Sequence, residues 1–253
     1  MVSASDLNRL NEPYSNEPEL EDSLHLAQIV LLLTCLEWWW QQRQDFFAAG
    51  NLSIYYQPPE LQSKKFRGPD FFVVLDTVRR PRRSWVVSNE GGKYPNVIVE
   101  ILSPATAKND RTIKKELYQD LFQTPEYFWF NPKPEKLEFR GFRLQNGRYE
   151  EILPTLQGWM WSEQLGLYLG VANGMLRYFT ADGVLIPNFE EESARTAQVI
   201  AAMEQRLEQE RQRTEQERQR AEQASSIVQQ QREELNRLRA FLRSQNINPD
   251  ELP

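Results

Sequence analysis

The sequence of 253 residues predicts an α/β or α+β sheet domain followed by a long C-terminal helix. Residues 71–75 and 97–102 form continuous apolar runs rich in β-branched residues, which is typical of central strands covered on both faces. A polar helical stretch at 109–122 separates the second run from an aromatic strand at 127–130, so helices and strands alternate. All 11 glycines and 7 tryptophans precede residue 190, and the residues after it cannot close a core.

Before residue 190 the chain is expected to begin with a polar arm at 1–20 and a helix from residue 21 to about residue 43. The helix is indicated by a broad apolar face that neither Gly nor Pro interrupts. A hairpin is expected around Asn146 and Gly147, because this pair suits a turn with positive φ. The remaining expected strands lie at 51–56, 136–144, 148–152, 165–169 and 175–179.

The segment 190–253 is expected to be a charged helical tail, separate from a sheet domain at 21–189. Apolar and small residues recur in it at alternating spacings of four and three, which is the a/d pattern of a coiled coil. Polar residues interrupt the middle of this pattern. A self-associating coiled coil through residues 200–243 and a lone helix stabilised by Glu–Arg pairs are therefore both retained. The a/d positions are Met203, Leu207, Glu210, Thr214, Glu217, Ala221, Ala224, Val228, Gln231, Leu235, Leu238 and Leu242.

Composition excludes several classes of chemistry. With 30 Lys+Arg against 36 Asp+Glu and a net charge of -6, the chain is not a general polycation, so any nucleic-acid surface must be local. Its one cysteine, Cys35, excludes an internal disulfide and a multi-cysteine metal site. Its one histidine, His25, excludes a His-rich metal site and is expected to be a packing or surface residue. A site built from Asp and Glu carboxylates is the class of chemistry that remains.

No targeting or membrane-spanning segment is predicted. The N-terminal arm is polar and acidic, without a basic region followed by an apolar stretch. The longest apolar run, at 29–36, is far shorter than the roughly 20 residues that a membrane span needs. The expected location is therefore the cytoplasm.

Two acids occupy unusual places in the expected sheet. Asp70 stands at the start of the strand 71–75, and Glu100 interrupts the apolar strand 97–102. A carboxylate inside a central strand carries a large desolvation penalty unless it is paired or binds a cation. If the two strands are neighbours, both acids lie at one end of the sheet and can share a divalent ion. Mg²⁺ fits best, because it is commonly held by one or two carboxylates together with waters and phosphate.

The helix expected at 109–122 supplies further candidates for the same site. Asp110, Lys114 and Tyr118 follow one another at intervals of four residues, which places them on one helix face. A lysine beside a phosphate can orient a nucleophile and stabilise developing negative charge. The alternatives are a solvated helix lysine for Lys114 and a core residue for Tyr118.

Four short motifs contain these candidates. They are Pro69-Asp70, then Val99-Glu100-Ile101-Leu102-Ser103-Pro104-Ala105-Thr106, then Asp110-Arg111 with Lys114 and Tyr118, and then Pro125-Glu126-Tyr127-Phe128-Trp129. Together, over about residues 20–180, they resemble the Uma-type restriction endonuclease family of the PD-(D/E)XK nuclease superfamily. The resemblance implies a restriction-endonuclease-like mixed sheet flanked by helices, and metal-dependent hydrolysis of DNA with Mg²⁺, or alternatively Mn²⁺. It implies Asp70 and Glu100 as metal ligands and catalytic residues, with Lys114 and Tyr118 as the matching lysine and tyrosine.

Two features depart from the superfamily pattern. The superfamily lysine stands two positions after the acid, but Leu102 occupies that position here. The resemblance to the Uma-type family places the lysine on the following helix instead, at Lys114. The superfamily also often has an acid on the first helix, for which Glu21 and Asp22 are both candidates.

A basic segment follows the strand 71–75. Its arginines Arg79, Arg80, Arg82 and Arg83 are candidates to contact a nucleic-acid backbone beside the metal. The alternative is a solvated loop that prevents edge-to-edge strand pairing.

Two functions of different classes remain. The first is a Mg²⁺-dependent endonuclease, a hydrolase acting on ester bonds, with DNA as the expected partner. The second is a catalytically inactive nuclease-like module that binds or assembles through its coiled-coil tail. The acidic pair and the lysine favour the first, whereas the displaced lysine and the long tail favour the second.

Overall fold

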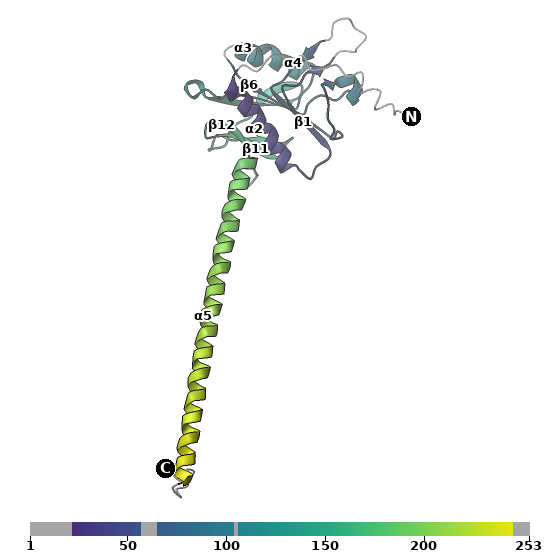
Figure 1. The fold of residues 1–253 in the computed structure, drawn as a ribbon. Helices are drawn as coiled ribbons and strands as arrows, with labels where there is room; N and C mark the ends of the chain where they lie inside the picture. The colour runs from purple at the N-terminus through teal and green to yellow at the C-terminus, as the bar shows by residue number, and fades with distance from the viewer. Residues whose placement is uncertain (1–21, 57–64, 104–105, 245–253) are drawn as a thin grey trace, which may run out of the picture. The chain divides into compact units, whose positions relative to one another are not determined.

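The computed structural model describes residues 22–56, 65–103 and 106–244, and the chain divides into two units, Met1–Glu191 and Glu192–Pro253. The first unit contains three β-sheets and short helices (Figure 1). The second consists, in its described part, of most of a single helix, α5 (Phe189–Ser244). None of the described helices is long and apolar enough to cross a membrane.

The centre of the first unit is a six-stranded sheet in the order β1-β4-β6-β7-β8-β9. Strands β6 and β7 are parallel, and the other neighbours are antiparallel. Parallel neighbours need a crossover, which the helical segment between β6 and β7 provides. The strands are β1 (Phe46–Gly50), β4 (Phe71–Leu75), β6 (Val97–Ile101), β7 (Glu126–Asn131), β8 (Glu138–Gln145) and β9 (Arg148–Glu151).

Two three-stranded sheets accompany the large one. In the first, β11 pairs antiparallel with both β10 and β12. In the second, β2 pairs antiparallel with β3 and parallel with β5. Their strands are β10 (Met160–Ser162), β11 (Leu167–Ala172), β12 (Met175–Phe179), β2 (Ile54–Tyr55), β3 (Phe66–Arg67) and β5 (Trp85–Val86).

One face of the large sheet is covered by helix α2 (Ser23–Trp39) and by the sheet β10–β12. Ile29, Leu32 and Leu36 of α2 share a buried cluster with Val73 and Val99 of the central strands. The side chain of Gln28 also hydrogen-bonds both backbone groups of Leu176 in β12, at 2.8 and 3.0 Å. Helix and small sheet therefore form one layer.

The crossover segment covers the opposite face of the large sheet. It consists of α3 (Ala107–Asn109), a π-helical turn η2 (Asp110–Lys114) and α4 (Lys115–Asp120). Tyr118 of α4 packs in a second cluster with residues such as Ile98. Two 3-10 turns, η1 (Val87–Glu90) and η3 (Pro134–Lys136), complete the unit.

The fold class expected from the sequence is confirmed: helices flank a mixed sheet and a long helix follows. Because both faces of β4 and β6 are covered, these strands are apolar except for Glu100, as their sequences indicated. The crossover was expected as one regular helix, but it contains a π-turn.

Several expected boundaries were wrong for local reasons. The first helix ends at Trp39, and the chain then forms β1, whose last three residues, Ala-Ala-Gly, have weak strand propensity. Asn51 has a φ of 46° and ends β1, so the expected strand 51–56 is limited to Ile54–Tyr55. Gly166, with a φ of 65°, makes a turn that delays the strand expected at 165–169 until Leu167.

Candidate functional site

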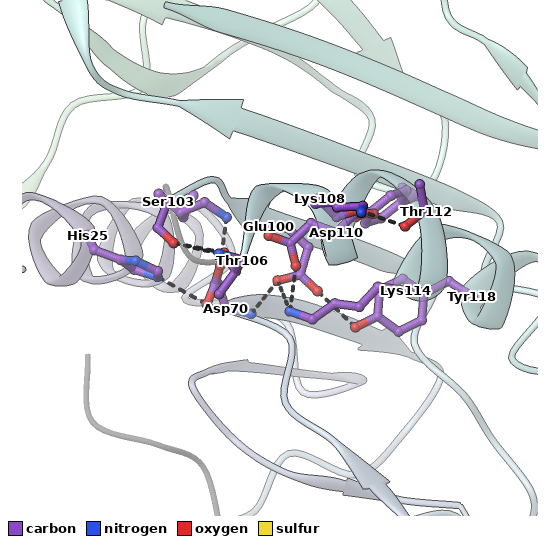
Figure 2. Close-up of polar contacts among 12 residues, drawn as sticks. His25, Asp70, Glu100, Ser103, Thr106, Lys108, Asp110, Thr112, Lys114 and Tyr118 are labelled. Atoms are coloured by element: carbon purple, nitrogen blue, oxygen red, sulfur yellow. Dashed lines mark hydrogen bonds and ion pairs between the residues drawn. The ribbon is translucent and has the colours of Figure 1, made fainter. Parts of the chain in front are cut away.

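Strand register brings Asp70 and Glu100 together. In the antiparallel pair β4–β6, Phe71 lies opposite Val99, so the next pair along the ladder is Asp70 and Glu100. The Asp70 N–H donates to Glu100 Oε2 at 3.3 Å. The two acids therefore meet at the C-terminal end of β6, beside the start of the crossover (Figure 2).

Glu100 has no exposed surface, and both of its carboxylate oxygens have donors. Tyr118 Oη donates to Oε1 at 2.8 Å, and Lys114 Nζ donates to Oε2 at 3.0 Å. Burial raises the pKa of Glu100 well above its usual value, although the positive charge of Lys114 opposes this shift. The same burial, together with the Glu100 carboxylate, raises the pKa of Tyr118, so its hydroxyl stays a proton donor.

The π-turn orients the lysine between two carboxylates. Lys114 Nζ lies 2.9 Å from Asp110 Oδ1 and 3.0 Å from Glu100 Oε2. Burial alone would lower the pKa of Lys114, but Glu100, Asp110 and Asp70 outweigh it and hold this pKa above its usual range. Burial raises the pKa of Asp110, against the opposing charge of Lys114. π-turns inside helices are frequent at functional sites.

Asp70 is held at both of its carboxylate oxygens. The Ile101 N–H donates to Oδ2 at 2.7 Å, and His25 Nε2 lies 3.0 Å from Oδ1 (Figure 2). Burial would raise the pKa of Asp70, but the hydrogen bond from His25 and the charge of Lys114 hold it below its usual range. The carboxylate is therefore fixed and ionised.

The structure changes the interpretation of the first helix. Asp22 caps α2, because its Oδ1 accepts from the His25 N–H at 2.8 Å. Its carboxylate is therefore committed to the helix end, while Glu21 lies outside the described residues. His25, expected to be a packing or surface residue, is buried and contacts Asp70. A histidine 45 positions before Asp70 in the sequence carries no local signal that it contacts this acid.

The donor set fits a divalent cation. Asp70, Glu100 and Asp110 bring three carboxylates to one ammonium group, that of Lys114. When all are ionised, the negative charge is in excess, which a divalent ion offsets. Two carboxylates on adjacent strands are a usual protein contribution to Mg²⁺ binding. Among the described residues, no cluster of three or more His, Cys, Asp or Glu side chains has metal-binding geometry.

Comparison with protein families gives one match that covers most of the first unit. The Uma2 family, described as "Putative restriction endonuclease", matches residues 16–178, more than half of the chain. The chain belongs to this family. No curated protein matches it. A crystal structure of "a putative nuclease belonging to DUF820 from Anabaena variabilis ATCC 29413" is similar at 14% identity and a TM-score of 0.42, covering 64% of this chain and 89% of that chain.

Within this Uma2 chain, the arginine segment is largely engaged in ion pairs. Arg79 pairs with Glu37. Arg80 and Arg82 both bind Glu90, at 2.6 and 2.7 Å. The Arg82 side chain has no exposed surface and lies over the rings of Phe47 and Trp85 at 4.6 and 4.8 Å. Arg83 is exposed. The segment follows the end of β4 that is opposite to Asp70, so the strand separates it from the acidic pair.

Removal of the Lys114 charge tests the electrostatic balance of the site. We expect Lys114→Met to lower the free energy of unfolding by about 3–5 kcal/mol near neutral pH, because it leaves buried carboxylates uncompensated. The loss should shrink as the pH is lowered from neutrality. Glu100, whose pKa is raised in the folded protein, then takes up a proton and one charge disappears.

Urea unfolding of both proteins at several pH values measures this effect. Lys108→Met is the matched control, because Lys108 is an exposed lysine of the same crossover and should change stability by no more than about 0.5 kcal/mol. A Lys114→Met protein as stable as this control would contradict the assigned balance.

Proposed function

We propose that this Uma2 protein is a Mg²⁺-dependent endonuclease that hydrolyses DNA phosphodiester bonds, with Mn²⁺ as an alternative ion. The observation that carries the proposal is the pairing of Asp70 and Glu100 across adjacent strands, with Lys114 Nζ 3.0 Å from Glu100. The family match supports a nuclease of this kind.

Asp70 and Glu100 would hold the metal. Each carboxylate is oriented in advance: Asp70 by the Ile101 N–H and Glu100 by the Tyr118 hydroxyl. Such orientation lowers the reorganisation needed on binding. When bound, a divalent ion neutralises phosphate charge and lowers the pKa of a coordinated water.

Lys114 would stabilise the negative charge that develops during hydrolysis, and Asp110 and Tyr118 would support it. Hydrolysis adds a water oxygen to phosphorus and breaks the bond to a bridging oxygen, which leaves with a proton, while negative charge accumulates on the phosphoryl oxygens. Lys114, cationic and only 17% exposed, can turn its ammonium from Glu100 to these oxygens. Asp110 keeps this lysine in place, and Tyr118 keeps Glu100 from following it.

His25 is a positioning residue in this proposal, because it contacts the carboxylate of Asp70 rather than the reacting atoms. Its ring fixes Oδ1 while the backbone fixes Oδ2, so the plane of the carboxylate is determined.

We also propose that the arginine segment contacts a nucleic-acid backbone, but through fewer of its arginines than the sequence indicated. Arg79 pairs with Glu37, and Arg80 and Arg82 pair with Glu90, so these ion pairs offset much of the positive charge of the segment. Arg82 is buried against aromatic rings and stabilises the loop. The charge offered to DNA therefore comes from the exposed side, where Arg83 lies.

The second candidate function, an assembly module, is favoured by α5. This helix of 56 residues has no buried residue in the described structure. Self-association through it is compatible with cleavage, and the two functions can reside in one protein.

Calorimetric titration of Mg²⁺ and Mn²⁺, with a plasmid-nicking assay on the same samples, tests the metal site. We expect the wild type to bind the ion and nick DNA, and Asp70→Asn and Glu100→Gln to lose both, down to the metal-free background. Glu126→Gln is the matched control. Glu126 is another buried glutamate, which accepts hydrogen bonds from Arg143 at 3.1 Å and from the Ser162 hydroxyl. The Glu126→Gln protein should retain both metal binding and nicking. A wild type that binds neither ion would overturn the proposal.

His25→Ala should weaken Mg²⁺ binding about 10–100-fold, because Asp70 then loses the partner that fixes Oδ1. At saturating Mg²⁺ the nicking rate should recover most of its wild-type value, which distinguishes positioning from catalysis. His25→Gln, which retains a donor, should lie between the two. Equal Mg²⁺ affinity in all three proteins would remove this role.

The salt dependence of DNA binding tests the arginine segment. We expect Arg83→Ala to reduce the slope of log K against log salt concentration by about 0.9, the value for one phosphate contact. Arg148→Ala, an exposed arginine on edge strand β9, is the control and should leave the slope unchanged. An unchanged slope in Arg83→Ala would assign this residue to the solvated loop instead.

A further inference from the structure

Helix α5 carries an apolar seam that nothing in the described chain covers. Met203, Leu207, Leu235 and Leu238 each expose between 50% and 61% of their surface. They belong to the a/d series of alternating three- and four-residue spacings, so they face one side of the helix. Exposed apolar residues that repeat in this way along a helix indicate a helical partner.

The seam is not uniform along the helix. Its N-terminal part, Ile200, Met203 and Leu207, is apolar, and so is its C-terminal part, with Val228, Leu235 and Leu238. Between them the seam carries Glu210, Thr214 and Glu217. We call these stretches the N-seam, the C-seam and the polar middle.

We propose that α5 pairs with α5 of a second copy of this chain in antiparallel orientation, with the N-seam of each copy packed on the C-seam of the other. The proposal goes beyond the nuclease function and does not depend on it. The orientation follows from the charges on the seam and along its flanks.

A parallel pair would bring like charges together. In register, Glu210 would meet Glu210 of the second copy inside the seam, and Glu217 would meet its own equivalent. The flanking e and g positions would add two more like pairs on each side, Arg206 with Arg211 and Arg213 with Arg218 of the second copy, against one opposite-charge pair, Glu234 with Arg239.

An antiparallel pair separates these charges. With Leu207 opposite Leu238 of the second copy, Glu210 lies opposite Leu235 and Glu217 opposite Val228, so no two seam carboxylates meet. The flanks then gain opposite-charge pairs, Arg213 with Glu234 and Glu204 with Arg239 of the second copy, against one like pair, Arg211 with Arg232.

The pairs seen within one α5 do not replace such a partner. Arg213 lies 3.3 Å from Glu217, and Arg218 lies 3.4 Å from Glu222, with all four side chains at least 65% exposed. Exposed pairs of this type support a helix weakly. They leave Leu207, Leu235 and Leu238 in water, which only burial against another apolar surface relieves.

Light scattering after size-exclusion chromatography tests the pairing. The full-length chain should have the mass of two copies. Leu238→Asn, in the seam, should shift it to one copy, whereas Ala240→Asn, on the outer face of the same turn, should leave two. A wild type of any other mass, or equal masses for both variants, would overturn the pairing.

Distances between spin labels test the orientation. In a Cys35→Ala background, which removes the buried native thiol, one label is placed at Gln205 or at Gln223. Because the antiparallel midpoint lies between Glu222 and Gln223, labels at Gln223 should be close, and labels at Gln205 should lie about 50 Å apart at 1.5 Å per residue. A distance below about 30 Å at Gln205 would indicate parallel helices and overturn the orientation.

Discussion

A glutamate with no exposed surface in a central strand needs all its hydrogen-bond donors inside the protein, and Glu100 finds them in two residues of the crossover and in the Asp70 N–H. Its pairing with Lys114 and Tyr118 ties β6 to the helical layer above it. A buried pair of this kind contributes little net stability relative to an apolar core, because desolvation offsets the attraction. Stability alone therefore does not account for the pair, which is the pattern expected of a functional site.

The large sheet determines where Glu100 and its neighbours lie. Antiparallel pairing of β4 and β6 fixes Asp70 opposite Glu100, and the parallel step from β6 to β7 forces a crossover to begin where Glu100 ends its strand. Helix α2, packed on the other face, brings His25 to the same edge. Three layers thus converge on a single carboxylate pair, which none of them could assemble alone.

Sequence reasoning succeeded where the signal is local. All residues of strands β4 and β6 except Glu100 are apolar, because both faces are covered, and a carboxylate is conspicuous in such a context. Helical spacing also placed Lys114 on one helix face with Asp110 and Tyr118, and the structure shows its Nζ 3.0 Å from Glu100. The edge strand β1 was missed, because its small residues give it weak strand propensity and its pairing with β4 is set by tertiary packing.

What the sequence could not supply depends on contacts between distant segments. His25 reaches Asp70 only because α2 packs across the sheet, and the Arg82 side chain is covered by Phe47 of the distant strand β1 as well as by its sequence neighbours Trp85 and Glu90. The spacing of residues in the sequence identifies neither the contact with Asp70 nor the one with Phe47. The π-turn could not be predicted from the sequence either, because one additional residue in a helical turn does not alter the amino-acid composition.

That additional residue makes the crossover tolerant of a change in length within the π-turn but not after it. A π-turn takes up one extra residue while the segments on either side keep their directions, so a deletion within Asp110–Lys114 would leave a regular helix with Asp110 and Lys114 still on one face. A deletion between Lys114 and Tyr118, where the helix is regular, would instead rotate Lys114 by about 100° relative to Tyr118 and turn it away from Glu100. Over evolutionary time, insertions and deletions in this family should therefore be absorbed by hairpins such as β8–β9 and by the π-turn, whereas the spacing between Lys114 and Tyr118 should be preserved.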